Sequence, residues 1–193
     1  MSAVATLMTT EELLALPENG IDRWLIAGEL REKSPGRGNK YHRNAMVHCL
    51  VMTRSAKFLD NWNDTQPPPR GQVLTGDAGV RLHEDPDTTF GLDVTYVSAQ
   101  VLARQTSAST IITGIPTLAV EILSPSDKLE EINEKIDALL AVGVPLVWII
   151  DPHHRTVTVH RPGVAPELFN IHQELSGEPH LPGFRMPVSR LFE

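Results

Sequence analysis

The sequence lacks the features of a secreted, membrane-spanning or redox-active protein. Its single cysteine, Cys49, excludes an intrachain disulfide. The apolar residues around Cys49 predict a small core residue rather than a nucleophile. No run of about 18 apolar residues is present, and the N-terminus has neither the basic head nor the long apolar stretch of a signal peptide. We therefore expect a cytoplasmic protein without a membrane segment.

Basic charge is also scarce. The chain carries 17 Lys and Arg against 24 Asp and Glu, which gives a net charge of −7. Proteins that hold nucleic acid over a broad surface are usually basic, so the composition argues against such a surface. A divalent cation in an acidic pocket, however, reverses the local charge and attracts phosphate. The acidic composition is therefore compatible with a metal-dependent enzyme that acts on phosphate esters.

Motifs of several other enzyme classes are absent. There is no Walker loop, no Rossmann glycine fingerprint and no zinc-knuckle cysteine pattern, and no histidine spacing matches the HExxH motif of zinc hydrolases. Ser124, Ser126 and Asp127 are best interpreted as turn and helix-cap residues, because no base for a serine nucleophile can be identified. These absences narrow the possible functions.

The patterns that are present predict an α/β chain folded as one domain over residues 1–193. A length of 193 residues with 41% hydrophobic content is sufficient for a buried core. Capping patterns and helical spacing predict helices over residues 9–16, 41–62 and 127–143. Apolar and β-branched runs predict strands over residues 23–33, 72–82, 92–97, 117–123, 146–150 and 156–160.

The third helix lies between two apolar strands and so forms a strand-helix-strand unit. Asp127 and Glu130 form the pattern of a capping box at its start, and Gly143 is a typical stop residue. In the C-terminal region, apolar side chains are expected to pack on the body of the protein: Leu181, Phe184, Val188, Leu191 and Phe192.

Two carboxylates are embedded in otherwise apolar strands, Asp93 in GLDVTYV and Glu121 in TLAVEIL. Burial of an unpaired carboxylate is costly, so such groups persist where a cation, a proton or hydrogen bonds compensate the charge. One divalent metal held by both acids, a backbone carbonyl and water would match the preferences of Mg²⁺. For Asp93 taken alone, an edge residue or a partner for an arginine is the alternative interpretation.

A lysine follows these acids in the third helix. On a helical projection, Lys135 lies about 60° from Ile132 and about 40° from Leu139, at the edge of the buried stripe. Its ammonium can therefore lean toward the strand carboxylates, orient a water or stabilise charge on phosphate. Lys128, on the same side of the helix, is the alternative donor, and a surface lysine with a buried stem is the alternative role for Lys135.

Several short segments form a pattern, by their order and spacing, that extends over nearly the whole chain from Thr9. They are Gly28-Glu29-Leu30, His42, Gly76-Asp77-Ala78-Gly79, Leu92-Asp93-Val94, residues 120–126, Lys135, Gly143-Val144 and residues 148–152. In these segments the sequence resembles the Uma-type family of restriction endonucleases, within the PD-(D/E)XK nuclease superfamily. The resemblance implies a restriction-endonuclease-like core, a mixed sheet flanked by helices.

The same resemblance assigns roles to residues. It implies that Asp93 and Glu121 are metal ligands, that the Ile122 carbonyl is a backbone ligand and that Lys135 is the catalytic lysine. The sequence departs from the superfamily pattern at Leu92, where a proline is usual, and at Leu123, which replaces the lysine of the E-x-K motif, so the lysine must come from the helix.

Three further residues are candidates for accessory roles. Glu29 and Asp77 can bind a metal or water, or can instead serve the turns at Gly28 and Gly76. His42 can contact phosphate or shuttle a proton, although a histidine at the start of a helix is usually a surface group.

The sequence thus predicts a Mg²⁺-dependent endonuclease that hydrolyses DNA phosphodiester bonds, with Mn²⁺ as a substitute metal. One alternative is a catalytically silent nuclease-fold protein that acts as a DNA-binding or protein-interaction module. Another is a hydrolase of RNA or of other phosphoesters. The oligomeric state stays open, although a homodimer is common among enzymes that cut both strands.

Overall fold

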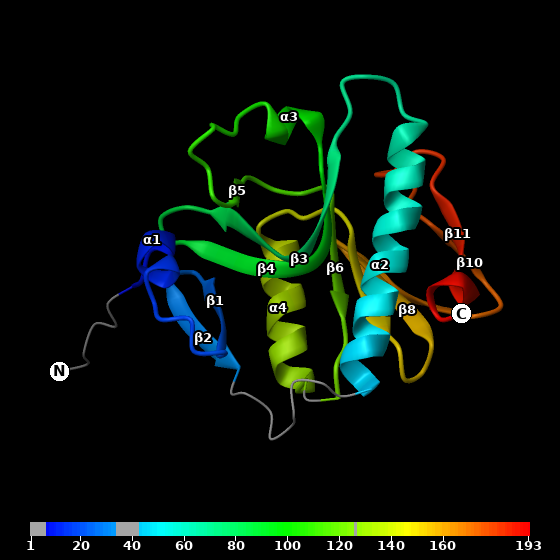
Figure 1. Ribbon diagram of the computed structural model, residues 1–193, viewed down its shortest axis with the longest axis horizontal. Coiled ribbons are helices and arrows are strands. Elements are labelled where there is room, and N and C mark those ends of the chain that lie inside the picture. The colour runs from blue at the N-terminus through cyan, green and yellow to red at the C-terminus, as the bar shows by residue number, and fades with distance from the viewer. Residues whose placement is uncertain (1–6, 34–42, 126) are drawn as a thin grey trace.

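The structure, a computed structural model, describes residues 7–33, 43–125 and 127–193. A mixed β-sheet runs through the molecule. One long helix, α2, lies on one side of its central strand β6, and another, α4, lies on the other side (Figure 1). The helices are α1 (Thr10–Leu14), α2 (Arg43–Asp64), α3 (Ala99–Leu102), α4 (Leu129–Ala141) and a terminal 3-10 helix η1 (Val188–Leu191). None of the helices in the described part of the chain is both long and apolar enough to cross a membrane.

In the described part of the chain, the main sheet has nine strands in the order β2-β1-β4-β6-β7-β8-β9, with β3 beside β4 and β5 beside β3. Its strands are β1 (Asp22–Ile26), β2 (Glu29–Lys33), β3 (Gln72–His83), β4 (Thr88–Val97), β5 (Ile112–Thr113), β6 (Leu118–Ile122), β7 (Val147–Asp151), β8 (Thr156–Arg161) and β9 (Val164–Asn170). Two short strands, β10 (Glu174–Ser176) and β11 (Arg185–Pro187), form a second sheet. The pairs β6/β7 and β3/β5 are parallel and the other pairs are antiparallel, so the expected mixed sheet is confirmed.

Strand β6 is buried on both faces, because alternate residues pack against different helices. Leu118, Val120 and Ile122 join a core cluster that includes Val51 of α2. Ala119 joins a second cluster, which includes residues of α4. A near-continuous apolar run is what a strand covered on both faces requires, and this explains why the sequence pattern predicted it correctly.

The predicted strand-helix-strand unit is confirmed as β6-α4-β7, with β6 and β7 paired in parallel. The predicted capping box of α4 is wrong. The helix begins after Lys128, which makes no capping hydrogen bond, and Asp127 instead accepts hydrogen bonds from the backbone N–H and the hydroxyl of Ser124. Asp127 therefore closes the turn between β6 and α4 rather than the first turn of the helix.

Two other interpretations of the sequence need correction. The segment 23–33 forms a hairpin of two strands, β1 and β2, joined at Ala27 and Gly28, which both have positive φ. A two-residue turn of this kind usually carries Asn-Gly or Asp-Gly, so Ala27 gave no signal. Cys49 is exposed on α2 rather than buried in the core.

The C-terminal region packs as expected. Leu181, Phe184, Val188 and Leu191 are buried in the cluster that includes α2, and Phe192 lies partly buried against it.

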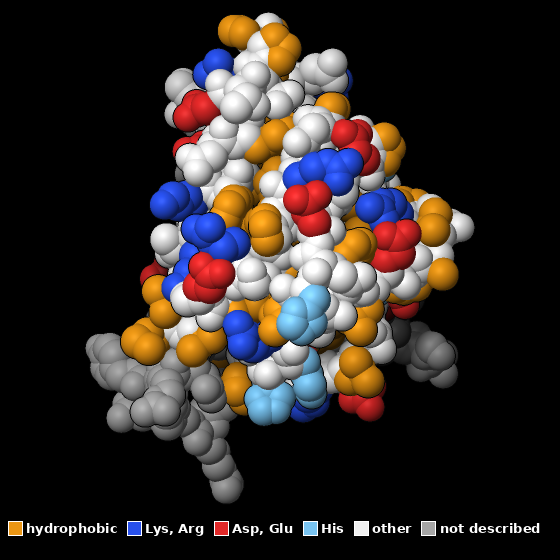
Figure 2. Space-filling view, turned by 90° about the vertical axis from the view of Figure 1, so that its right-hand side faces the viewer, with side chains coloured by type: hydrophobic (Ala, Val, Ile, Leu, Met, Phe, Trp, Pro, Cys, Tyr) orange, Lys and Arg blue, Asp and Glu red, His pale blue; other side chains and the backbone are white. Residues whose placement is uncertain are grey.

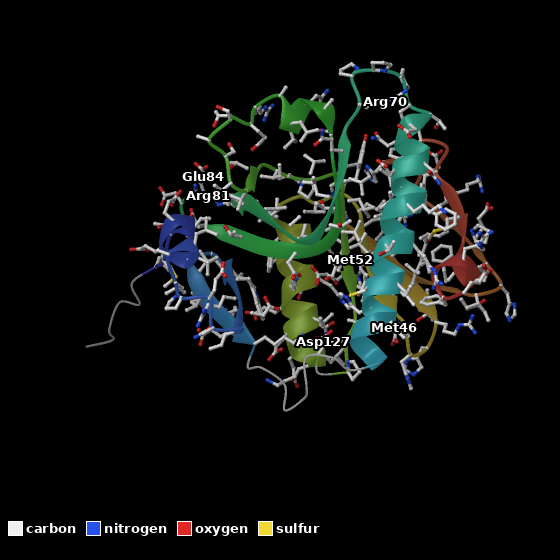
Figure 3. The ribbon with its side chains drawn as sticks, viewed as in Figure 1. Met46, Met52, Arg70, Arg81, Glu84 and Asp127 are labelled. Atoms are coloured by element: carbon white, nitrogen blue, oxygen red, sulfur yellow. The ribbon has the colours of Figure 1, made fainter. Side chains whose placement is uncertain are left out.

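Asp87 joins three segments that are distant in sequence. The backbone N–H and the hydroxyl of Thr10 both donate to its Oδ2 at 2.6 Å, and so does Arg81 Nη2 at 2.6 Å. Its carbonyl accepts the N–H of Gly28. Figure 3 shows Arg81 and Glu84 beside α1. Burial raises the pKa of Asp87, but the hydrogen bonds from Thr10 and Arg81 outweigh this effect and lower the pKa from 3.8 to about 2.

We predict that Asp87→Asn destabilises the protein by roughly 2–3 kcal/mol at pH 7, the free energy that corresponds to this lowering of the pKa. Because the folded-state pKa is lowered, this stability is present above the unfolded pKa and is lost as the pH falls through the folded value. Urea unfolding should therefore show a gap between parent and variant that closes between about pH 4 and about pH 2.

The exposed neighbour Asp85, whose positive φ also suits Asn, provides the control Asp85→Asn. A gap for Asp87→Asn that is equally large at pH 2 and pH 7 would contradict the electrostatic explanation.

Candidate active site

One cavity brings together the residues that the sequence singled out for catalysis. It has a volume of about 180 Å³ and is lined by Asp93, Glu121 and Lys135, together with Ile122 and Asp77. Strands β3, β4 and β6 contribute residues to the lining, together with His48 of α2 and Lys135 of α4. The three predicted catalytic residues therefore line one cavity.

The two acids lie where β4 and β6 part. The antiparallel register of these strands ends at the pair Val94 and Val120, one residue before Asp93 and Glu121. Beyond that pair, the backbone N–H of Ile122 donates to Asp93 Oδ2 at 2.7 Å, so a side chain replaces the partner strand as acceptor. Asp93 is 8% exposed and Glu121 is 9% exposed. The parting strands thus bury two carboxylates next to each other.

Glu121 forms an ion pair with Lys135, whose Nζ lies 2.6 Å from Oε1. Lys135 also donates to the Gly91 carbonyl at 3.2 Å and lies 5.4 Å from the centre of the Phe90 ring. Apart from this ion pair, the buried Oε1 has no hydrogen-bond donor among the described residues.

The pKa values of this pair move in the same direction. Burial raises the pKa of Glu121 to about 7; the ammonium of Lys135 opposes this effect, and the charge of Asp93 adds to it. Burial lowers the pKa of Lys135, but Glu121, with the charges of Asp93 and Asp22, outweighs this effect and the pKa is raised. Lys135 therefore stays protonated at neutral pH, which suits a hydrogen-bond donor and not a base.

Asp77 reaches the cavity through an irregularity in β3. The register between β3 and β4 shifts at Gly76 and Asp77, which have φ values of +82° and +55°. Positive φ is uncommon for residues other than glycine, and such strain is often found at functional sites. Gly91 lies opposite, where an added Cβ would come within 3.4 Å of Asp77 Cβ. Asp77 is exposed as a residue, but partial desolvation of its carboxyl group, followed by repulsion from Asp93, raises its pKa.

The structure distinguishes between the two candidate lysines. Lys128 has a side chain that is 69% exposed and pairs with Glu131, which lies three residues further along α4. The side chain of Lys135 is 16% exposed and contacts Glu121. Lys135 is therefore the helix lysine whose ammonium meets the acids.

The accessory candidates have different outcomes. Asp77 lines the cavity as described above. Glu29 does not: it lies on β2, exposed, and pairs with Arg31 at 3.0 Å. The residue His42 lies outside the described residues.

The sequence interpretation missed His48 of α2, which lines the same cavity. Its Nε2 lies 3.2 Å from Asp93 Oδ2, and the hydrogen bond to Asp93 raises the pKa of the imidazole. A signal was present, because His48 precedes the buried residues Val51 and Ser55 by three and seven positions, on the face of α2 that packs on the sheet. A histidine on that face is either a core residue or a site residue.

Asp22 and Lys33, at the two ends of the β1–β2 hairpin, also line the cavity. Lys33 forms an ion pair with Asp127 in the turn after β6. Sequence reasoning could not find these residues, because their position depends on how the hairpin is placed against β4 and α4.

The remaining oxygens of the two acids fit a hard divalent cation. Asp93 Oδ2 faces Ile122 and His48, and Glu121 Oε1 faces Lys135. Among the described residues, none donates a hydrogen bond to Asp93 Oδ1 or Glu121 Oε2. No group of three or more Asp, Glu, His and Cys in the described ranges is arranged to hold a metal. A cation here would therefore need backbone and water oxygens as well, which is the usual coordination of Mg²⁺.

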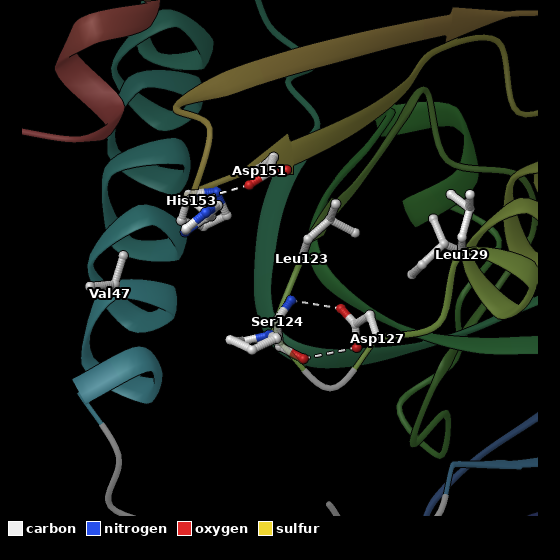
Figure 4. A pocket seen from close by; sticks show the side chains of 10 residues that line it. Val47, Leu123, Ser124, Asp127, Leu129, Asp151 and His153 are labelled. Carbon is white, nitrogen blue, oxygen red and sulfur yellow. Dashed lines mark hydrogen bonds between the residues drawn. The ribbon is translucent and has the colours of Figure 1, made fainter.

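A larger hollow of about 630 Å³ lies beside the cavity and shares Ser124, Asp127 and Ile132 with it. It opens between α2 and the ends of β6 and β7, with Val47 on one side and Leu129 on the other (Figure 4). Asp151 accepts hydrogen bonds from the backbone of His153 and from His154 in this region. The hollow extends the accessible surface next to the paired acids.

A mixed sheet flanked by helices, with acids on two adjacent strands, defines the restriction-endonuclease-like fold class. A crystal structure of "a putative nuclease belonging to DUF820" from Anabaena variabilis ATCC 29413 has the same fold, with a TM-score of 0.74 and 20% sequence identity. The match covers 96% of this chain and 97% of that chain.

The model of the family described as "Uma2: Putative restriction endonuclease" matches residues 10–189, and the chain belongs to this family. The resemblance inferred from the sequence is thereby confirmed. No curated protein matches the chain.

We predict that Asp77→Asn stabilises the protein at neutral and alkaline pH. The folded-state pKa of Asp77 is raised, so its contribution to stability is present below the unfolded value of 3.8 and is lost as the pH rises through the folded value. Asn removes the charge and tolerates positive φ. The melting temperature of the variant should exceed that of the parent at about pH 8 and approach it in the acid range.

Asp60→Asn, on the exposed side of α2, is the control and should show no such trend. A variant that melts below the parent at every pH would show that the Asp77 carboxylate stabilises the fold.

Proposed function

We propose that the protein is a Mg²⁺-dependent endonuclease that hydrolyses phosphodiester bonds in DNA. The observation that carries this proposal is the pair Asp93 and Glu121, buried side by side next to the ammonium of Lys135. One oxygen of each acid receives no hydrogen bond from any residue that the structure describes. Membership of the Uma2 family and the fold shared with the nuclease from Anabaena variabilis support the same class of reaction.

Each residue has a distinct role in this proposal. Asp93 and Glu121 bind the cation, and the carbonyl of Ile122, which also lines the cavity, is the backbone ligand. Bound Mg²⁺, or Mn²⁺ in its place, would lower the pKa of a coordinated water and neutralise charge on the phosphate. Lys135 stays protonated and donates from Nζ to the attacking water or to a phosphate oxygen. Asp77 adds negative charge at the rim, which attracts the cation.

The distribution of charge indicates how DNA would be held. The face of the molecule on the right-hand side of Figure 1 carries Lys and Arg among Asp, Glu and apolar side chains, without a continuous basic surface over its described residues (Figure 2). With a net charge of −7, the protein would depend on the cation to attract phosphate at the cavity. DNA binding should therefore be weak without a divalent metal. A homodimer and a cytoplasmic location stay predictions from the sequence.

We predict that purified protein nicks or linearises supercoiled plasmid with Mg²⁺ or Mn²⁺, but not with EDTA. Glu121→Gln and Asp93→Asn should each reduce the cleavage rate by about 100-fold or more, because each removes a charged ligand of the cation that acts on the phosphate. The same assay with single-stranded DNA, double-stranded DNA and RNA identifies the substrate.

Cleavage by Glu121→Gln at the parent rate would contradict the mechanism. Faster cleavage of RNA than of DNA would favour the RNA hydrolase. A parent protein that binds DNA but cuts no substrate would favour the silent binding module.

The two lysines of α4 provide a matched test of the donor. Lys135→Met keeps the length of the side chain and removes the ammonium, and it should reduce cleavage by about 10²–10³-fold. Lys128→Met removes an exposed ammonium and should leave the rate unchanged. Melting curves check that both variants fold. Loss of activity in Lys128→Met with retention in Lys135→Met would reverse the assignment.

A further inference from the structure

The cavity receives one side chain from α2 among the described residues, and that side chain is His48. The other residues of the cavity come from β-strands, from the turn after β6 and from α4. A second helix therefore contributes to the acidic site through a single imidazole.

Packing fixes where α2 presents this imidazole. Val51, Ser55 and Leu59 follow His48 by three, seven and eleven positions, and all three are buried between α2 and the sheet. His48 continues this buried face by one turn toward the cavity. The side chain of His48 is partly buried, so the packing of α2 on the sheet restricts where the imidazole can lie.

The contacts of Asp93 show what the imidazole does there. Oδ2 of Asp93 receives the N–H of Ile122 at 2.7 Å and faces Nε2 of His48 at 3.2 Å. The two donors approach the same oxygen from different elements, one from β6 and one from α2. Two donors from different elements restrain the orientation of a carboxylate more than one donor does.

We infer that His48 is a positioning residue for Asp93: with the Ile122 amide it holds Oδ2, so that Oδ1 is directed at the cation. This inference rests on the proposed function, because it assigns His48 a purpose only if Asp93 binds a metal. Hydrogen-bonded partners of metal-binding carboxylates orient them, and their loss typically costs about 10–100-fold in metal affinity. Because Nε2 donates to the carboxylate, it has no lone pair to offer the metal.

The test measures Mn²⁺ binding by electron paramagnetic resonance or calorimetry in the absence of nucleic acid. His48→Phe and His48→Leu remove the donor, whereas His48→Gln keeps an N–H at similar reach. The two donor-free variants should bind Mn²⁺ about 10–100-fold more weakly than the parent, and His48→Gln should recover most of the affinity. His172→Leu, which replaces an exposed histidine, should bind as the parent does.

The possible results separate the two claims. If the parent does not bind Mn²⁺, the cation site fails, and the role of His48 fails with it. If the parent binds Mn²⁺ and both donor-free variants bind equally well, the role of His48 alone is overturned. If His48→Gln binds as weakly as His48→Phe while both melt at the parent temperature, the imidazole acts in some way other than as a donor to Asp93, and the inference is also overturned.

Discussion

The burial of two carboxylates where β4 and β6 part is the constraint on which the rest of the site depends. If β4 and β6 were regular, their backbone pairing would continue past Val94 and Val120. Instead, the backbone N–H of Ile122 donates to the side chain of Asp93. Buried charge of this kind destabilises a fold unless donors and cations compensate it. The ammonium of Lys135 supplies part of that compensation, and the raised pKa of Glu121 shows that it is incomplete.

Helices on both faces of the sheet supply side chains that compensate the buried negative charge. One core cluster holds α2 and the other holds α4, and β6 contributes alternate residues to each. His48 of α2 lies beside Asp93, and Lys135 of α4 lies beside Glu121. The two acids therefore have different partners although they are neighbours in the sheet. The irregularity at Asp77 brings a third carboxylate to the rim at the expense of backbone strain.

Sequence patterns were sufficient where one local signal determined the structure. The central strands and α4 were predicted because continuous apolar runs and a helical stripe are strong signals, and Asp93 and Glu121 stood out as charges within them. For Glu29 two roles stayed open, because the alanine at positive φ gave no sign of the hairpin turn beside it. His48 was missed because its helical spacing indicates only the face of α2 on which it lies, whereas its role depends on which strand lies under that helix.

The position of Lys135, the lysine that we propose for catalysis, follows from the geometry of β6. In the E-x-K motif of the superfamily, the acid and the lysine are two residues apart on a strand and so share one face. In this chain that face is the one covered by α4, and Leu123 packs partly buried against its core cluster. An ammonium placed on α4 at Lys135 therefore approaches Glu121 from the side on which a strand lysine would lie. Because α4 supplies the ammonium, the residue at position 123 can be apolar. Leu123 then packs against the cluster that holds α4 in place.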